Sequence, residues 1–159
     1  MGQIQVEKNA GGIEGLCVIT PTVHGDSRGY FMETYNQKDM EEAGLTMQFV
    51  QDNQSSSTKG VLRGLHFQIN FPQDKLVRVV NGEVFDVAVD LRKGSKTFGK
   101  WYGVVLSAEN KKSPRSPRGE PTGFGGSEWI YLTGVCRYLL FNSLRRMRSN
   151  PTLLRPADR

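Results

Sequence analysis

The sequence predicts a single all-β domain, either a barrel or a sandwich of two sheets. Its 159 residues are enough for one hydrophobic core, and no internal repeat or linker divides them. The chain contains 18 glycines and 7 prolines. These turn-forming residues separate many short segments of alternating apolar and polar character, which is the pattern of strands joined by turns.

Seven of these segments predict strands, and one predicts a helix. The predicted strands cover residues 15–21, 30–35, 46–52, 61–68, 75–80, 83–90 and 101–106. Asn81-Gly82 is a strong two-residue hairpin signal and predicts that the strands on either side of it pair. Residues 37–44 predict a short helix that Gly44 ends. Seven or eight short strands with such spacing suit a double-sheet jelly roll.

The strand at 83–90 carries two carboxylates on one of its faces. Alternation places Asp86, Ala88 and Asp90 on that face, away from Phe85, Val87 and Val89. The two carboxylates would then meet a cation on a neighbouring strand, either Lys75 or Arg78. We expect a structural ion-pair set here, with a direct catalytic role as the alternative.

The run Val61-Leu62-Arg63-Gly64-Leu65-His66-Phe67-Gln68 contains one of the two histidines of the chain. Histidine takes up and releases a proton near neutral pH, so His66 is a candidate general base. The alternative is a hydrogen-bonded histidine in a core strand. In an unbroken strand Arg63 and His66 would point to opposite faces, whereas a β-bulge at Gly64 would bring both to one face. We predict that bulge.

Composition argues against several other classes of protein. No apolar run is long enough for a membrane span, and the first residues lack a signal-peptide pattern, so we expect a cytoplasmic protein. Cys17 and Cys136 have neither metal-ligand nor redox spacing, and only His24 and His66 are available for a His-rich metal site, so no metal is expected. No nucleotide-cofactor motif is present, and no cofactor is expected.

The net charge of +5 comes entirely from the last third of the chain. Residues 1–110 carry 11 basic and 13 acidic side chains, whereas residues 111–159 carry 10 and 3. A basic tail is typical of nucleic-acid-binding arms. This tail has no recognisable binding module, so we expect no nucleic-acid partner, and a basic-tailed interaction protein is kept as an alternative.

Several motifs together resemble the dTDP-4-dehydrorhamnose 3,5-epimerase family. They follow the family's order within residues 4 to 112, and they are V-L-R-G-L-H-F-Q at 61–68, G-D-S-R-G-Y-F-M-E at 25–33, F-V-Q-D-N at 49–53, G-E-V-F-D-V-A-V-D-L-R at 82–92 and L-S-A-E-N-K at 106–111. The resemblance implies an all-β fold of the double-stranded jelly-roll, cupin-like type, with short helices, as one domain over residues 1–159.

The resemblance also implies an activity and its residues. The enzyme would invert C3 and C5 of dTDP-4-dehydro-6-deoxy-D-glucose, giving dTDP-4-dehydro-L-rhamnose, by removing and returning protons. His66 would be the base, and Lys75 or Arg63 would stabilise the enolate on O4. Tyr131 is the nearest match to the family's tyrosine acid, although it lies about four residues early. Such a protein would be a homodimer that binds a dTDP-sugar.

Nucleotide and sugar contacts are implied for four further residues. Arg28 matches the family's diphosphate contact, and Glu33, Gln51 and Asn53 match its nucleotide and sugar contacts. From sequence alone, Gln51 and Asn53 could equally anchor a loop, and Glu33 could be a charge at the rim of the fold.

Residues 113–159 depart from the family's pattern. Where the family has P-E-G-F-A-H-G-F, this chain reads R-G-E-P-T-G-F, and codons for A-H-G-F read one nucleotide later begin with Pro-Thr-Gly. We hypothesise that residues 113 onward are partly a frame-shifted reading of an epimerase gene. We then expect the tail to lack the family's second histidine and to supply no strands that close the barrel. A catalytically impaired cupin-type sugar-nucleotide binding protein is therefore the alternative function.

Overall fold

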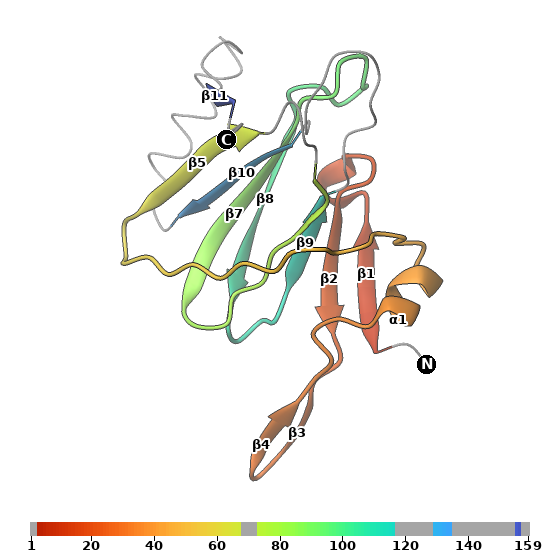
Figure 1. Ribbon diagram of the computed structural model, residues 1–159, viewed down its shortest axis with the longest axis vertical. Coiled ribbons are helices and arrows are strands. Elements are labelled where there is room, and N and C mark those ends of the chain that lie inside the picture. Colours follow the sequence, from red (N-terminus) through yellow and green to blue (C-terminus); the bar gives the residue numbers. More distant parts are fainter. Residues whose placement is uncertain (1–2, 68–72, 117–128, 135–154, 157–159) are drawn as a thin grey trace.

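Two β-sheets and a projecting hairpin make up the computed structural model of the chain (Figure 1). The structure describes residues 3–67, 73–116, 129–134 and 155–156, with the backbone alone for 64–67, 129–134 and 155–156. Its strands are β1 Ile4–Lys8, β2 Cys17–Pro21, β3 His24–Asp26, β4 Gly29–Phe31, β5 Leu62–Phe67, β6 Lys75–Leu76, β7 Glu83–Asp90, β8 Trp101–Ser107, β9 Ser113–Ser116, β10 Trp129–Gly134 and β11 Arg155–Pro156. The all-β, jelly-roll prediction is confirmed.

The first sheet has the strand order β1-β2-β9-β6, and the second has the order β11-β5-β10-β7-β8. Every strand pair in the two sheets is antiparallel except β11 with β5. The third unit is the β3-β4 hairpin, which projects away from both sheets (Figure 1). Sequence neighbours therefore often lie in different sheets.

A hydrophobic core fills the space between the sheets. It contains Ala10, Ile13 and Leu16 from the segment that joins β1 to β2, together with Val18 of β2 and Ala88 of β7. Val77 and Tyr102 pack against this cluster. Because side chains alternate along a strand, Val18 and Ala88 identify the face of each sheet that points inward.

A second cluster covers the outer face of the first sheet. Helix α1, Gln37–Glu42, contributes Met40 to it, and the adjoining chain contributes Leu45 and Met47. The side chain of Asn36 caps the helix by accepting a hydrogen bond from the Asp39 amide, at 3.3 Å. The predicted helix is thus confirmed. Figure 1 shows it beside β1.

Three predicted strands differ from the structure, and one of them, expected at 75–80, is only the two-residue β6. Residues 46–52 form no strand, because Met47 is buried against the sheet by its side chain while the backbone has no ladder partner. The strand expected at 30–35 is only the short β4 of the hairpin. The strand β1 was not predicted, although its alternation of Ile4 and Val6 with polar residues is a strand pattern.

The hairpin predicted at Asn81-Gly82 is wrong. The strand before it, β6, pairs with β9 in the first sheet, whereas β7 pairs with β8 and β10 in the second. Gly82 does adopt a positive φ of 76°, so a turn forms there. The turn carries the chain from one sheet to the other instead of pairing its two strands.

The expectation that the tail supplies no closing strands is also wrong. The strand β9 lies between β2 and β6, and β10 lies between β5 and β7, so both occupy interior positions of their sheets. Arg115 of β9 forms an ion pair with Asp74 at 2.8 Å and donates a hydrogen bond to the carbonyl of Gly15 at 3.4 Å. The residues after Lys112 therefore take part in the fold.

Candidate active site

Lys75 and Ser116 lie side by side on the inner face of the first sheet. They are cross-strand partners on β6 and β9, and partners in a ladder share a face. Ser116 is only 1% exposed, and its Oγ has no hydrogen-bond partner within the described part of the chain. Lys75 is half-buried. The sheet thus brings an ammonium group and a hydroxyl into the interior.

Asp86 enters the same interior from the opposite sheet. It is 2% exposed and lies two residues from Ala88, whose side chain belongs to the core between the sheets. Burial lowers the pKa of the Lys75 ammonium, and the negative charge of Asp86 opposes that effect. The charge of Asp86 thus acts on Lys75, one of the two cations expected near it.

The other predicted carboxylate serves a different partner. Asp90 is fully buried and forms an ion pair with Arg92 at 2.9 Å, and it accepts hydrogen bonds from the hydroxyls of Ser95 and Thr97. Burial alone would raise its pKa, but these donors outweigh burial and hold the pKa at about 2. Asp90 anchors the loop between β7 and β8. Arg78 is exposed and lines a pocket on the other face of the first sheet.

The register of β10 places Tyr131 opposite His66 on one side and opposite Ala88 on the other. One row across the sheet thus contains the candidate base, the candidate acid and a core residue of the inner face. Thr133 lies opposite Arg63, so the register shifts between the two pairs and one extra residue sits on β5 between Arg63 and His66. That interval contains Gly64, and the predicted bulge is confirmed.

The side chain of Arg63 is held at the start of β5. Its Nε donates to the Ser57 hydroxyl at 2.8 Å, and its Nη2 donates to the Ser56 carbonyl at 2.9 Å. Arg63 is exposed, so its guanidinium lies at the surface and not in the interior between the sheets. The polar loop before β5 orients it.

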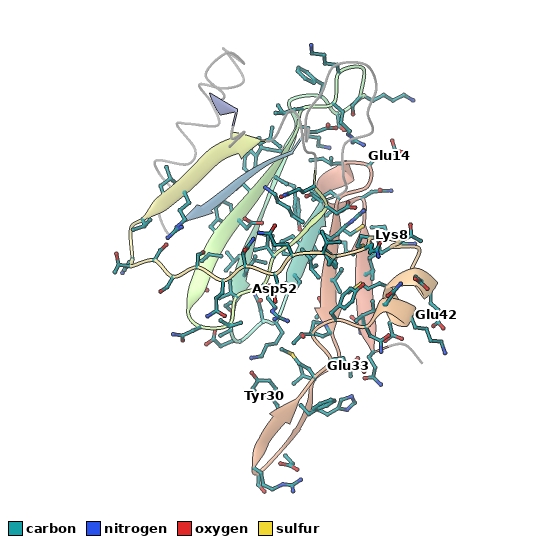
Figure 2. All side chains as sticks on the ribbon, in the orientation of Figure 1. Lys8, Glu14, Tyr30, Glu33, Glu42 and Asp52 are labelled. Atoms are coloured by element: carbon teal, nitrogen blue, oxygen red, sulfur yellow. The ribbon has the colours of Figure 1, made fainter. Side chains whose placement is uncertain are left out.

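The nucleotide-contact candidates lie apart from that row. Arg28 is at the tip of the β3-β4 hairpin, where it forms an ion pair with Asp26 at 2.6 Å. Glu33 lies at the base of the hairpin (Figure 2) and accepts from the amide of Asn36 at 3.3 Å. Both candidates therefore belong to the hairpin unit, and the described chain does not bring them to His66.

Gln51 and Asn53 belong to the extended segment that runs from α1 across the front of the sheets to β5 (Figure 1). Their side-chain amides are joined by a hydrogen bond from Gln51 Nε2 to Asn53 Oδ1 at 3.1 Å. Both residues are exposed. In Figure 2 their neighbour Asp52 marks where this segment passes in front of the sheets. The pair is available to a ligand that approaches from solvent.

A separate pocket of ≈ 370 Å³ lies between the hairpin base and the outer face of the first sheet. Its lining combines apolar residues such as Met40 with Glu33, Arg78 and Lys111. The Lys111 ammonium donates to the Tyr30 hydroxyl at 2.9 Å. This contact ties the turn between β8 and β9 to the hairpin.

Ser116 is the site residue that sequence reasoning missed. It belongs to the segment that departs from the family's pattern, so no motif pointed to it. Only its pairing with Lys75 reveals its position.

Among the described side chains, no group of three or more His, Cys, Asp and Glu residues could hold a metal ion. None of the helices described is long and apolar enough to cross a membrane.

Comparison with known proteins identifies relatives of this chain. Residues 10–128 match the family dTDP-4-dehydrorhamnose 3,5-epimerase. The curated enzyme of that name from Methanothermobacter thermautotrophicus is 57% identical over 112 residues, covering 70% of this chain and 60% of the relative. The chain thus spans less than two thirds of that relative's length.

Solved structures show the same fold. The dTDP-4-dehydrorhamnose 3,5-epimerase of Bacillus anthracis, with TDP and PPi bound, is 39% identical with a TM-score of 0.71, over 82% of this chain and 70% of that one. The dTDP-6-deoxy-D-glucose-3,5-epimerase of Legionella pneumophila, in complex with dTDP-4-keto-L-rhamnose, is 44% identical with a TM-score of 0.67, over 82% and 69%. With its motifs, its two-sheet fold and these relatives, the chain belongs to the dTDP-4-dehydrorhamnose 3,5-epimerase family.

Proposed function

We propose that this protein is an epimerase that inverts C3 and C5 of dTDP-4-dehydro-6-deoxy-D-glucose. The observation that carries the proposal is the register of Tyr131 with His66 in a chain of this family. A base and an acid in one row of the sheet could act on the same carbon of a substrate held between the sheets. The Legionella relative was solved with dTDP-4-keto-L-rhamnose, the product of that double inversion.

The reaction needs only proton transfers. The C4 ketone acidifies the hydrogens on C3 and C5. His66 takes one of these protons, and the electron pair of the broken C–H bond moves into an enolate on O4. Tyr131 returns a proton to the same carbon from the opposite face, and both residues regain their starting states by exchange with solvent. No electrons enter or leave, so no redox partner is needed.

The charge that develops on O4 needs a cation that is already in place. Lys75 meets this need, because the interior holds its ammonium group away from bulk water, where a charge interacts more strongly. Arg63 is fixed at the surface by Ser56 and Ser57 and suits a phosphate or sugar oxygen. We assign Lys75 to the enolate and Arg63 to the binding of substrate.

The dTDP part of the substrate requires cations for its diphosphate and amides for its base. Arg28 is the candidate for the diphosphate, and Gln51 with Asn53 and Glu33 are candidates for the nucleoside and sugar. Because Arg28 and Glu33 lie on the projecting hairpin, we propose that the hairpin packs on a second copy of the chain in a homodimer. Its Tyr30 and Phe31 are 60% and 68% exposed, an apolar surface that such packing would bury.

Deuterium incorporation tests the proposed function directly. The purified protein is incubated with dTDP-4-dehydro-6-deoxy-D-glucose in deuterated water, and the sugar is followed by NMR. We expect deuterium at C3 and C5 and the appearance of the L-rhamno product. Binding of the nucleotide with no incorporation at either carbon would instead establish a sugar-nucleotide binding protein without catalysis.

The oligomeric state and the compartment follow from separate observations. Light scattering of the full chain is expected to give twice the protomer mass, and Phe31→Ser to shift the mass toward the monomer. We also propose a cytoplasmic location, which the buried thiol of Cys17 supports, because it is free within the described part of the chain and reduced cysteines are usual in that compartment. If light scattering of the unmodified chain at working concentration gives the mass of a single protomer, the proposed homodimer is contradicted.

A further inference from the structure

We propose that Lys111 is a positioning residue that fixes the direction of the β3-β4 hairpin, a role that rests on the proposed epimerase function. The hairpin unit carries Arg28 at its tip and Glu33 at its base, the candidates for contacts with the dTDP-sugar (Figure 2). Binding residues on a projecting hairpin meet a substrate only if the hairpin has a defined direction. Neither the resemblance to the family nor the comparison with relatives assigns this part to Lys111.

The contact of Lys111 with the hairpin is made to Tyr30 of β4. The ammonium group donates a hydrogen bond to the Tyr30 hydroxyl at 2.9 Å and lies 4.1 Å from the centroid of its ring. The cation therefore meets both the polar end of the tyrosine and the electron-rich face of its ring. The two residues are 81 positions apart, so the contact joins the hairpin to a distant part of the chain.

The hairpin has little packing of its own to hold it. Every residue of β3 and β4 is exposed, and among the described strands these two pair only with each other. On the β3 side, Gln3 contacts the His24 ring at 2.9 Å and accepts from the amide of Thr22 at 2.6 Å. On the β4 side, Lys111 makes the corresponding contact. Support on both sides gives the hairpin one direction, whereas support on one side would let it swing.

The backbone of Lys111 is held in a conformation that lysine rarely adopts. Its φ is 56°, in the left-handed region where a residue with a Cβ is strained. The turn before it enforces this conformation, because the Asn110 side chain donates to the carbonyl of Val105 at 2.9 Å and accepts from the amide of Ser107 at 3.1 Å. Strain persists where the surroundings over-determine it, and it clusters at functional positions. The turn thus acts as a rigid support that aims the Lys111 side chain at Tyr30.

The contact lies beside one of the candidate binding residues. Tyr30, Glu33 and Lys111 all line the pocket of ≈ 370 Å³ between the hairpin base and the first sheet. A hairpin freed from Lys111 would change the positions of Glu33 and Arg28 relative to the sheets. The loss should therefore appear in the binding of substrate and not in the proton transfers at His66.

Lys111→Gly separates the contact from the backbone strain. Glycine adopts a positive φ at little cost, so this variant keeps the turn and removes the ammonium group. We expect KM for dTDP-4-dehydro-6-deoxy-D-glucose and Kd for dTDP to rise by about 2- to 10-fold, the range of one hydrogen bond with a cation–π contact, with kcat nearly unchanged. A residue with only a structural role would instead change the melting temperature and leave binding intact. Lys111→Arg restores a cation and is expected to recover much of the affinity.

Further variants test the same contact from the hairpin side. Tyr30→Leu removes both the hydroxyl and the ring, keeps the position apolar, and is expected to match Lys111→Gly, which it replaces if the glycine variant does not fold. Tyr30→Phe keeps the ring, so a smaller rise in KM is expected. Lys112→Ala removes the neighbouring exposed lysine and is the matched control, with wild-type binding expected. Circular dichroism and thermal melting establish that each variant is folded.

Amide hydrogen exchange of residues 22–31 tests the contact without activity. We expect exchange to become about 2- to 10-fold faster in Lys111→Gly and to keep the wild-type rate in Lys112→Ala. Unchanged exchange in a folded Lys111→Gly protein overturns the proposal, whatever the activity. Faster exchange with unchanged KM and dTDP affinity also overturns it, because the hairpin would then move without effect on the substrate. A wild-type protein without turnover contradicts the proposed function, while exchange and dTDP affinity still decide the role of Lys111.

Discussion

Tyr131 lies directly opposite His66 on the neighbouring antiparallel strand. In the sequence this tyrosine is displaced by about four residues from where the family's motif would have it. The strand pairing, and not the spacing along the chain, decides whether two residues can serve one substrate. The following predictions start from this pair and its surroundings.

His66→Ala is expected to abolish both deuterium incorporation and product formation, because it removes the only base in the row with Tyr131. The loss should be at least roughly 10²-fold, the usual contribution of a general base. His24→Ala is the matched control, since the other histidine of the chain lies at the start of β3, where it contacts Gln3 at 2.9 Å. Retention of wild-type exchange by a folded His66→Ala protein contradicts the assignment of the base.

Lys75→Ala is expected to lower kcat by roughly 10²-fold with a smaller effect on the affinity for dTDP, because the ammonium acts on charge that exists only in the transition state. Arg63→Ala should chiefly raise KM, since this guanidinium lies at the surface. Lys112→Ala removes an exposed lysine and serves as the control. Steady-state kinetics and dTDP titration calorimetry separate these effects. A Lys75→Ala protein with normal turnover would show that Lys75 is not the cation that stabilises the enolate.

Asp90→Asn is expected to destabilise the fold at neutral pH by roughly 2–3 kcal/mol, given a folded pKa of about 2 against an ordinary value of 3.8. A lowered pKa contributes stability above the unfolded value, and that stability disappears as the pH falls from about 4 toward 2. Urea unfolding of both proteins at pH 7 and at pH 2.5 measures it.

The difference between the Asp90→Asn and wild-type proteins should therefore be large at pH 7 and small at pH 2.5. Asp52→Asn, at an exposed position in the segment before β5, is expected to match the wild type at both pH values. An Asp90→Asn protein as stable as the wild type at pH 7 would show that the network around Asp90 adds nothing to the fold.

Gly11→Ala is expected to destabilise the protein more than Gly99→Ala. Both glycines have positive φ, 62° and 75°, so both substitutions strain the backbone by roughly 1–2 kcal/mol. A Cβ at Gly11 would also lie 2.6 Å from Cδ2 of Tyr102, whereas at Gly99 it would meet nothing within 4 Å. Denaturant unfolding should show an additional loss of about 1–3 kcal/mol for Gly11→Ala. Equal losses would mean that Tyr102 moves aside freely.

The frame-shift hypothesis for residues 113 onward predicts a one-nucleotide discrepancy when the coding DNA is sequenced again. The intact protein would then differ from the 17.8 kDa of the chain as written. A continuous reading frame, a mass of 17.8 kDa and a cooperative melt would remove the hypothesis. In that case the ion pair of Arg115 with Asp74 is part of the native fold.

Local signals in the sequence determined the features that depend on near neighbours. Helix α1 follows from Asn36 as its cap and from Gly44, whose φ of 78° ends it. The strand β7 follows from strict alternation, which also placed Asp86 on one face with Ala88. The bulge before His66 was predictable because Gly64 interrupts a strand in which two polar residues would otherwise point apart.

The tertiary structure alone decided which strands meet. Asn81-Gly82 marks a turn whether the strands on its two sides pair or not. Only the sheets show that β6 and β7 lie in different sheets. The pairing of Ser116 with Lys75, and that of Tyr131 with His66, join residues far apart in the chain. Such contacts depend on how buried faces match across whole sheets, and no local propensity encodes that match.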